Sequence, residues 1–317
     1  MIRTHEGSDV SPLARIDWTA ITRRPPFAVD EAAVQRRVHG HGVLITGAAG
    51  SLGAPLAHSL AAAGPAKLVL YDQHESSLFR LRQALAAAVP GLVLHAVLAD
   101  VREPRRLRRV MGEVRPDLIF HLAAYKHVPW GEEDPESFAA TNVLGARHVI
   151  DAARESGVAQ IVYPSTDKAI SPPSLYGATK RLSEAMLRAT AMAGGPRSVI
   201  VRFVNVLGSQ GSTTETFARQ IRAGQALTIT DPLMRRYWIT PQHANLLLLH
   251  AACLGGPEEP ALTVAPDAGD EITIMDIARR LWSALTPALV PTSPEQRGEP
   301  AITITGPRPG ERLAEPL

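Results

Sequence analysis

The 317-residue sequence has little of several residue types, and each shortage excludes a class of protein. Cys253 is the only cysteine, so no intramolecular disulfide can form and a reducing compartment is expected. Its apolar neighbours predict a buried, inert thiol rather than a nucleophile. No apolar run reaches the roughly 18 residues that cross a bilayer, and the first residues lack the apolar core of a secretion signal. We therefore expect a cytoplasmic protein with no membrane span.

An excess of either charge is also missing. The chain has 33 basic and 31 acidic residues, for a formal net charge of +2. This balance argues against a nucleic-acid partner and against a polybasic membrane surface. The short basic cluster from Arg102 to Arg109 has the spacing of a solvated helix face.

Short apolar runs alternate with segments of helical periodicity over much of the chain. This alternation predicts a Rossmann-type α/β fold, in which helices cover both faces of a doubly wound parallel sheet. After residue 206 the alternation becomes irregular, and prolines and short strands appear between helices. We assign residues 1–40 to an N-terminal arm, 41–206 to the Rossmann domain, and 207–317 mainly to a smaller substrate-binding lobe interleaved with it.

A glycine-rich turn follows the first predicted strand. Gly47, Gly50 and Gly53 form a G-x-x-G-x-x-G pattern, which lets backbone N–H groups approach a pyrophosphate at a helix N-terminus. Asp72 ends the second predicted strand, where a carboxylate accepts the ribose hydroxyls of adenosine and repels a 2′-phosphate. The pattern therefore favours NAD over NADP. Further cofactor contacts are expected from Ser51, Leu52, Asp100, Val101 and Ala123.

A second motif indicates redox chemistry. Tyr176 and Lys180 lie four residues apart, so their side chains share one face of a helix. A nearby ammonium lowers the pKa of a tyrosine and makes it a usable base, and the same lysine can hold the nicotinamide ribose. Following five strand–helix units and a glycine-rich turn, this pair resembles that of the extended short-chain dehydrogenase/reductase superfamily.

Longer blocks narrow the resemblance. The segments "HLAAYKHVPWGEEDPESFAATNVLGARHVI", "PSTDKAISPPSLYGATKR", "VRFVNVLGSQGS", "ITDPLMRRYWIT" and "GPRPGERLAEPL" are similar, in this order, to the inverting UDP-N-acetylglucosamine 4,6-dehydratases. These are the nucleotide-sugar dehydratases of polysaccharide biosynthesis. The similarity runs from about Gly42 almost to Leu317, and "ITRRPPFAVDE" resembles the segment that precedes the catalytic domain in longer, membrane-anchored members.

A dehydration explains why charged residues stand just before the Tyr–Lys motif. Oxidation of carbon 4 needs only Tyr176 and a hydroxyl partner, Thr166, and it acidifies the proton on carbon 5. A base must then remove that proton, and an acid must protonate the departing hydroxyl of carbon 6. We assign Lys168 as the base and Asp167 as the acid. The resemblance implies reprotonation of carbon 5 from the opposite face, so the predicted enzyme is a C-5-inverting hydro-lyase.

The substrate is expected to be a UDP-sugar, and no metal site is predicted. Two alternatives stay open: a nucleotide-sugar 4-epimerase, which would not need the Asp–Lys pair, and a catalytically silent NAD-binding regulator. The helix that carries the tyrosine commonly forms a dimer interface in this fold, so a homodimer or higher homo-oligomer is expected. The predicted substrate contacts are Lys126, Asn205, Arg236, Arg308 and Glu311.

Overall fold

A seven-stranded sheet forms the centre of the computed structural model, which describes residue 13 and residues 16–25, 27–289 and 298–316. Its strand order is β11-β6-β5-β4-β1-β2-β3, and every neighbouring pair is parallel. The order changes direction between β1 and β4, which is the switch point where such folds bind ligands. The predicted Rossmann-type fold is therefore confirmed. The strands of the sheet are β1 (Gly42–Thr46), β2 (Lys67–Asp72), β3 (Leu94–Leu98), β4 (Leu118–His121), β5 (Gln160–Thr166), β6 (Arg197–Phe203) and β11 (Ala261–Val264).

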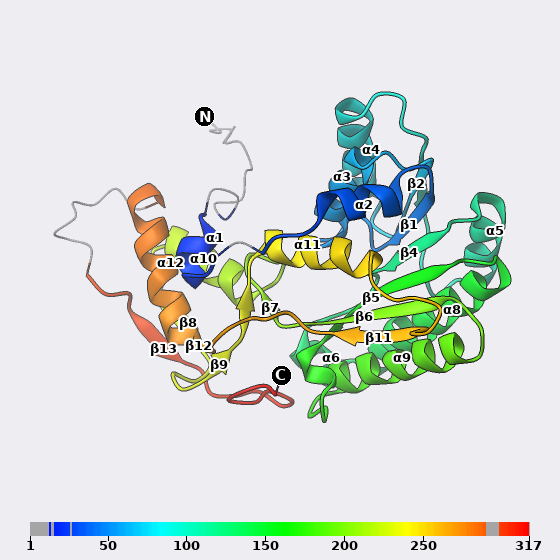
Figure 1. Cartoon of the computed structure of the whole chain (residues 1–317). Coiled ribbons are helices and arrows are strands. Elements are labelled where there is room, and N and C mark those ends of the chain that lie inside the picture. Colours follow the sequence, from blue (N-terminus) through cyan, green and yellow to red (C-terminus); the bar gives the residue numbers. More distant parts are fainter. Residues whose placement is uncertain (1–12, 14–15, 26, 290–297, 317) are drawn as a thin grey trace, which may run out of the picture.

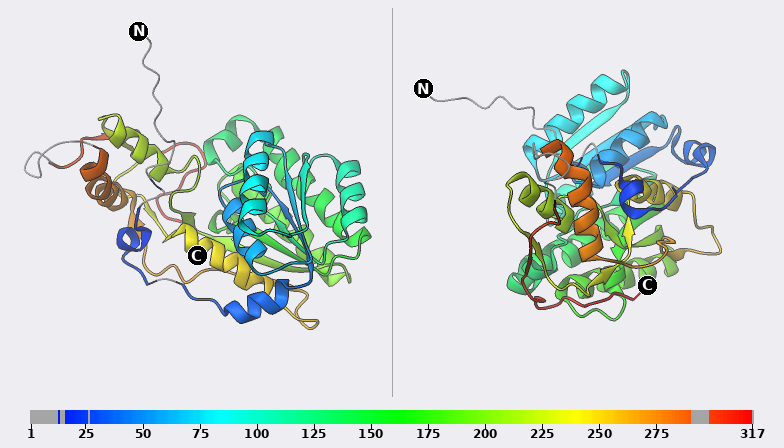
Figure 2. Two further views of the ribbon diagram at one scale, coloured as in Figure 1. Left: turned by 90° about the horizontal axis from the view of Figure 1, so that it is seen from above. Right: turned by 90° about the vertical axis from the view of Figure 1, so that its left-hand side faces the viewer.

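The sheet separates two apolar cores. Successive residues of a strand point to opposite faces, so Val43 and Ile45 pack into one core while Leu44 packs into the other. Helices cover both faces of the sheet and bury both cores (Figures 1 and 2). The first face carries α2 (Glu31–Val38), α3 (Gly53–Ala62), α4 (Glu75–Ala88) and α11 (Pro241–Ala252), and the second carries α5 (Pro104–Val114), α8 (Gly145–Glu155) and α9 (Leu175–Met192).

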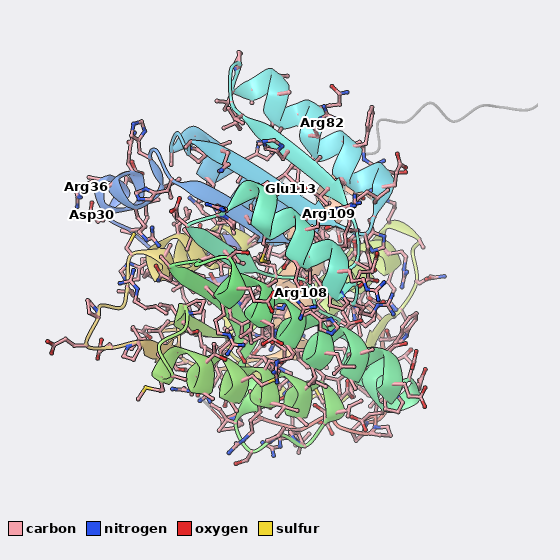
Figure 3. The ribbon with its side chains drawn as sticks, turned by 90° about the vertical axis from the view of Figure 1, so that its right-hand side faces the viewer. Asp30, Arg36, Arg82, Arg108, Arg109 and Glu113 are labelled. Carbon is pink, nitrogen blue, oxygen red and sulfur yellow. The ribbon has the colours of Figure 1, made fainter. Side chains whose placement is uncertain are left out.

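The sequence predicted an exposed basic cluster and a buried Cys253. The basic cluster lies on the outer side of α5, where Arg108 and Arg109 are exposed (Figure 3). The Nε atom of Arg108 lies 3.0 Å from a carboxylate oxygen of Glu155 on the neighbouring helix. Cys253, expected to be buried, is only partly buried after α11, and burial raises the pKa of its thiol.

A third apolar core belongs to a smaller lobe beside the sheet (Figure 1). It is built from α10 (Thr213–Arg222), α12 (Ile274–Leu289), β8 (Leu227–Ile229) and, from the N-terminal arm, Ile21 of α1 (Trp18–Thr22). The arm thus divides between the two bodies, since α1 packs in the lobe while α2 packs on the sheet.

Short elements complete the described chain. Three two-stranded pairs join β7 with β10, β8 with β13, and β9 with β12. None of the described helices is long and apolar enough to span a bilayer. The remaining elements are α6 (Val128–Glu133), α7 (Pro135–Phe138), η2 (Ala139–Leu144), η3 (Asp167–Ala169), β7 (Asn205–Val206), β9 (Arg235–Arg236), β10 (Trp238–Ile239), β12 (Ile272–Thr273) and β13 (Ile302–Ile304).

Candidate functional site

The glycine turn joins β1 to α3 at the switch point. Gly47 has a φ of +67°, and a Cβ atom there would lie 2.8 Å from the amide nitrogen of Ala123. A Cβ on Gly53 would overlap the carbonyl oxygen of Gly47. A Cβ on Gly50 would meet only that oxygen, at 3.3 Å. The protein therefore requires glycine at the two ends of the turn, whereas the middle glycine leaves room for a ligand, as a dinucleotide cradle needs.

Asp72 connects the turn to the end of β2. Its Oδ2 accepts a hydrogen bond from the amide of Ala49 at 2.8 Å, and its Oδ1 accepts one from the amide of His74 at 2.8 Å. A carboxylate has about four acceptor sites, so two remain for ribose hydroxyls. The aspartate that was predicted to bind ribose also shapes the glycine turn.

Three of the other predicted cofactor residues, Asp100, Val101 and Ala123, follow the ends of β3 and β4. Asp100 accepts from the Nε atom of Arg102 at 2.9 Å. Burial pushes the pKa of Asp100 upward, but hydrogen bonds from Arg102 outweigh it and the net shift is downward. Val101 is buried, and the amide of Ala123 donates to the hydroxyl of Thr46 at 3.4 Å. Ser51 and Leu52 stand in the glycine turn itself.

The predicted acid and base form one contact directly after β5. The Nζ atom of Lys168 lies 3.0 Å from Oδ1 of Asp167, whose side chain is 1% exposed. The same oxygen accepts from the Thr166 hydroxyl at 2.9 Å, while Oδ2 is buried with no hydrogen-bond partner among the described residues. Asp167 is therefore in contact with both neighbours, and the side chain of Lys168 reaches the surface only in small part, at 14% exposed.

The helix α9 presents Tyr176 and Lys180 to the same region. Burial raises the pKa of Tyr176, a hydrogen bond with Thr166 opposes this, and the charge of Asp167 adds to it. The sequence predicted a lowered pKa from Lys180, so this prediction is wrong for the structure as it stands. Burial lowers the pKa of Lys180 to about 7, although nearby Glu184 raises it. Its Nζ lies 4.0 Å from the ring centroid of Tyr163.

A partly buried ion pair between Glu184 and Arg202 lies next to these groups, and it was not predicted from the sequence. Glu184 accepts from Nη2 of Arg202 at 2.7 Å and from the hydroxyl of Ser165 at 2.6 Å. It thereby ties α9 to β5 and β6. Its spacing of four residues from Lys180 was the available signal, because it places both side chains on one helix face.

Asn142 fixes the loop that follows β4. Its Oδ1 accepts from the amide of Tyr125 at 2.8 Å, and its Nδ2 donates to the carbonyl of Tyr125 at 2.9 Å and to Thr179 at 3.1 Å. It lies in η2, a π-helical turn, and such turns often mark functional sites. The side chain thus orients the segment that carries Lys126.

The predicted substrate residues are only partly brought together. Lys126 donates to the hydroxyl of Ser209 at 3.3 Å. The Nδ2 atom of Asn205 is buried and has no hydrogen-bond partner in the described chain, which suits a ligand contact. Arg308 pairs with Glu311 at 2.8 Å.

Arg236 has partners that the sequence did not suggest. It is 6% exposed and donates to the carbonyls of Arg235, Arg312 and Leu313 at 2.7–3.1 Å. These contacts hold the C-terminal segment and turn its guanidinium toward backbone rather than a diphosphate. The contact of Arg236 with UDP therefore stays a prediction.

The family model described as "Polysaccharide biosynthesis protein" matches residues 43–317. The chain belongs to this family. Within it, the chain is 33% identical to the capsular polysaccharide biosynthesis protein CapD of Staphylococcus aureus over 98% of its own length, but it spans only 50% of that relative. It is 34% identical to a Campylobacter jejuni UDP-N-acetylglucosamine 4,6-dehydratase (inverting), over 70% of this chain and 68% of the relative. The predicted family resemblance is confirmed.

Solved structures with the same fold agree with the architecture of this family member. Pen from Bacillus thuringiensis superimposes with a TM-score of 0.75 at 28% identity, covering 87% of this chain and 80% of the other. The UDP-glucose 4-epimerase of Thermus thermophilus, solved with NAD, has a TM-score of 0.67 at 24% identity, covering 87% and 89%. The latter likeness concerns the fold alone.

Proposed function

We propose that this chain is an NAD-dependent, C-5-inverting nucleotide-sugar 4,6-dehydratase that acts on UDP-N-acetylglucosamine or a close analogue. The observation that carries the proposal is the buried contact between Asp167 and Lys168, 3.0 Å long, directly after β5. A redox-only enzyme has no task for this pair. The Campylobacter relative named as an inverting dehydratase supports the same reading.

The proposed cofactor fits the glycine turn and Asp72. NAD held there would supply the hydride acceptor for carbon 4 and, once reduced, the hydride donor for carbon 6. Tyr176 is the proposed acceptor of the proton of the carbon-4 hydroxyl, and its hydrogen bond with Thr166 lowers its pKa against the larger effect of burial. Lys180 lies one helical turn away and holds the nicotinamide ribose.

The elimination falls to the Asp–Lys pair. One proton can pass between Lys168 and Asp167 across their 3.0 Å contact, which converts an ion pair into an amine and a carboxylic acid. Only this second form offers a base for the carbon-5 proton and an acid for the carbon-6 hydroxyl at the same time. The loss of water follows from that proton transfer.

The central test follows the product of UDP-N-acetylglucosamine by mass spectrometry and NMR. Lys168→Ala is expected to slow water release by at least about 100-fold while NAD binding is kept. Lys67→Ala, at the start of β2, is the matched control and should behave as wild type. Water release by Lys168→Ala at the wild-type rate would show that the proposed base is wrong.

A 4-epimerase is the second candidate, because a UDP-glucose 4-epimerase of Rickettsia conorii is 32% identical over 66% of this chain. An epimerase would leave the mass unchanged and invert carbon 4. The same NMR spectrum therefore distinguishes the two reactions.

A further inference from the structure

The C-terminal segment reaches the candidate active site from the far end of the chain. Residues 307–316, here called the strap, run from the smaller lobe back toward the sheet (Figure 1). The lobe strand β9 holds it, since the amide of Arg235 donates to the carbonyl of Leu313 at 2.7 Å. The adjacent Arg312 donates to the carbonyl of Ser171, in the segment that follows β5 and η3, at 2.5 Å.

The strap places a carboxylate beside Lys168, the proposed base. The Oε1 atom of Glu315 lies 3.7 Å from Nζ of Lys168, and its side chain is 2% exposed. Its Oε2 atom is buried and has no hydrogen-bond partner within the described chain. An unpaired buried carboxylate is costly, so its position here requires a compensating charge.

We propose that Glu315 is a positioning residue that, together with Asp167, holds the amine of Lys168 and controls how readily it releases its proton. This role rests on the proposed dehydratase function, in which Lys168 must act as a base. A second carboxylate beside an ammonium stabilises its charged form, so removal of the charge of Glu315 should make the proton of the amine easier to release.

The surrounding charges agree with this role. Burial raises the pKa of Glu315, Lys168 lowers it, Asp167 raises it, and Arg236 and Arg312 lower it. Two carboxylates therefore share one amine, while Arg236 holds the strap through the backbone of Arg312 and Leu313.

The test compares Glu315→Gln, which removes the charge at constant shape, with Glu315→Asp, which keeps it. Glu299→Gln is the control, because Glu299 is 76% exposed and pairs with Arg279. Competitive acetylation with acetic anhydride, read by peptide mass spectrometry from pH 5 to 10, gives the midpoint at which Lys168 becomes reactive. The pH dependence of dehydration is measured on the same proteins, and thermal unfolding shows whether each variant folds.

In Glu315→Gln we expect the midpoint of Lys168 labelling to fall by about one pH unit, because the ammonium loses a stabilising charge. The rising limb of the pH profile of dehydration should move to lower pH by a similar amount. Glu315→Asp should remain nearer to wild type, and Glu299→Gln should match it. Equal midpoints in wild type and folded Glu315→Gln would overturn the inference. A shifted midpoint in a protein that releases no water would instead refute the proposed function while the coupling of Glu315 to Lys168 stands.

Discussion

The buried amine of Lys180 provides a quantitative prediction. Burial lowers its pKa to about 7 from the ordinary value of 10.5, and the residue is 3% exposed. Between these two values the unfolded chain binds a proton that the folded chain does not. As far as Lys180 is concerned, the free energy of unfolding is therefore highest above pH 10.5 and decreases as the pH falls toward 7. Below pH 7 this group changes it no further. At about 1.4 kcal/mol for each pH unit, the whole window corresponds to about 5 kcal/mol.

We predict that Lys180→Met removes this dependence. The variant should exceed wild type in unfolding free energy, and this difference should be largest at or below pH 7. Between pH 7 and pH 9 the difference should shrink by about 2–3 kcal/mol. Such a change is large against a total stability of about 5–15 kcal/mol.

Urea unfolding followed by circular dichroism at pH 6, 7, 8 and 9 measures the effect. Lys67→Met, at the start of β2, controls for the loss of a lysine elsewhere. A gap between Lys180→Met and wild type that stays constant over this range would refute the reasoning, because it would mean that the amine keeps its proton in the folded protein.

Three further predictions concern the glycine turn and the loop after β4. Gly53→Ala places a Cβ on the carbonyl of Gly47 and should lower the unfolding free energy by about 1–3 kcal/mol in urea titrations. Gly50→Ala should unfold within about 1 kcal/mol of wild type yet bind NAD at least about tenfold more weakly by calorimetry, and unchanged affinity would contradict the cradle. Asn142→Ala leaves the amide and carbonyl of Tyr125 without their partner, so both the unfolding temperature and the kcat of dehydration should fall. If both values stayed at those of wild type, the hydrogen bonds of Asn142 would not be what positions this loop.

The fold was predictable because its signals are local. The buried run over Val43 to Thr46, the glycine stop after α3 and the repeated alternation all act over a few residues. Parallel strands then bring their carboxyl ends to one edge, so the placement of Thr166, Asp167 and Asp72 near the switch point follows from the topology. The division of the N-terminal arm between two cores did not follow, because its weak periodicity does not say which surface each helix will cover.

The pKa values of the Tyr–Lys pair were less predictable. A spacing of four residues shows that Tyr176 and Lys180 share a helix face, but it does not show how deeply either is buried. In the structure, burial is the largest influence on both groups, and it raises one pKa and lowers the other. The depth of burial depends on Tyr163 and the rest of the sheet, which no local motif records.

Arg236 and Glu315 show why long-range contacts decide a charged residue's role. A guanidinium group can donate hydrogen bonds to a diphosphate or to backbone carbonyls, so the sequence around Arg236 could not show which of them lies against it. The structure places the carbonyls of the strap against it, and the same strap places Glu315 beside Lys168. Within residues 312–315 the strap thus contacts both a strand of the smaller lobe and the proposed base that follows β5. The charges around Lys168 therefore depend on a segment from the far end of the sequence, which no motif around Lys168 records.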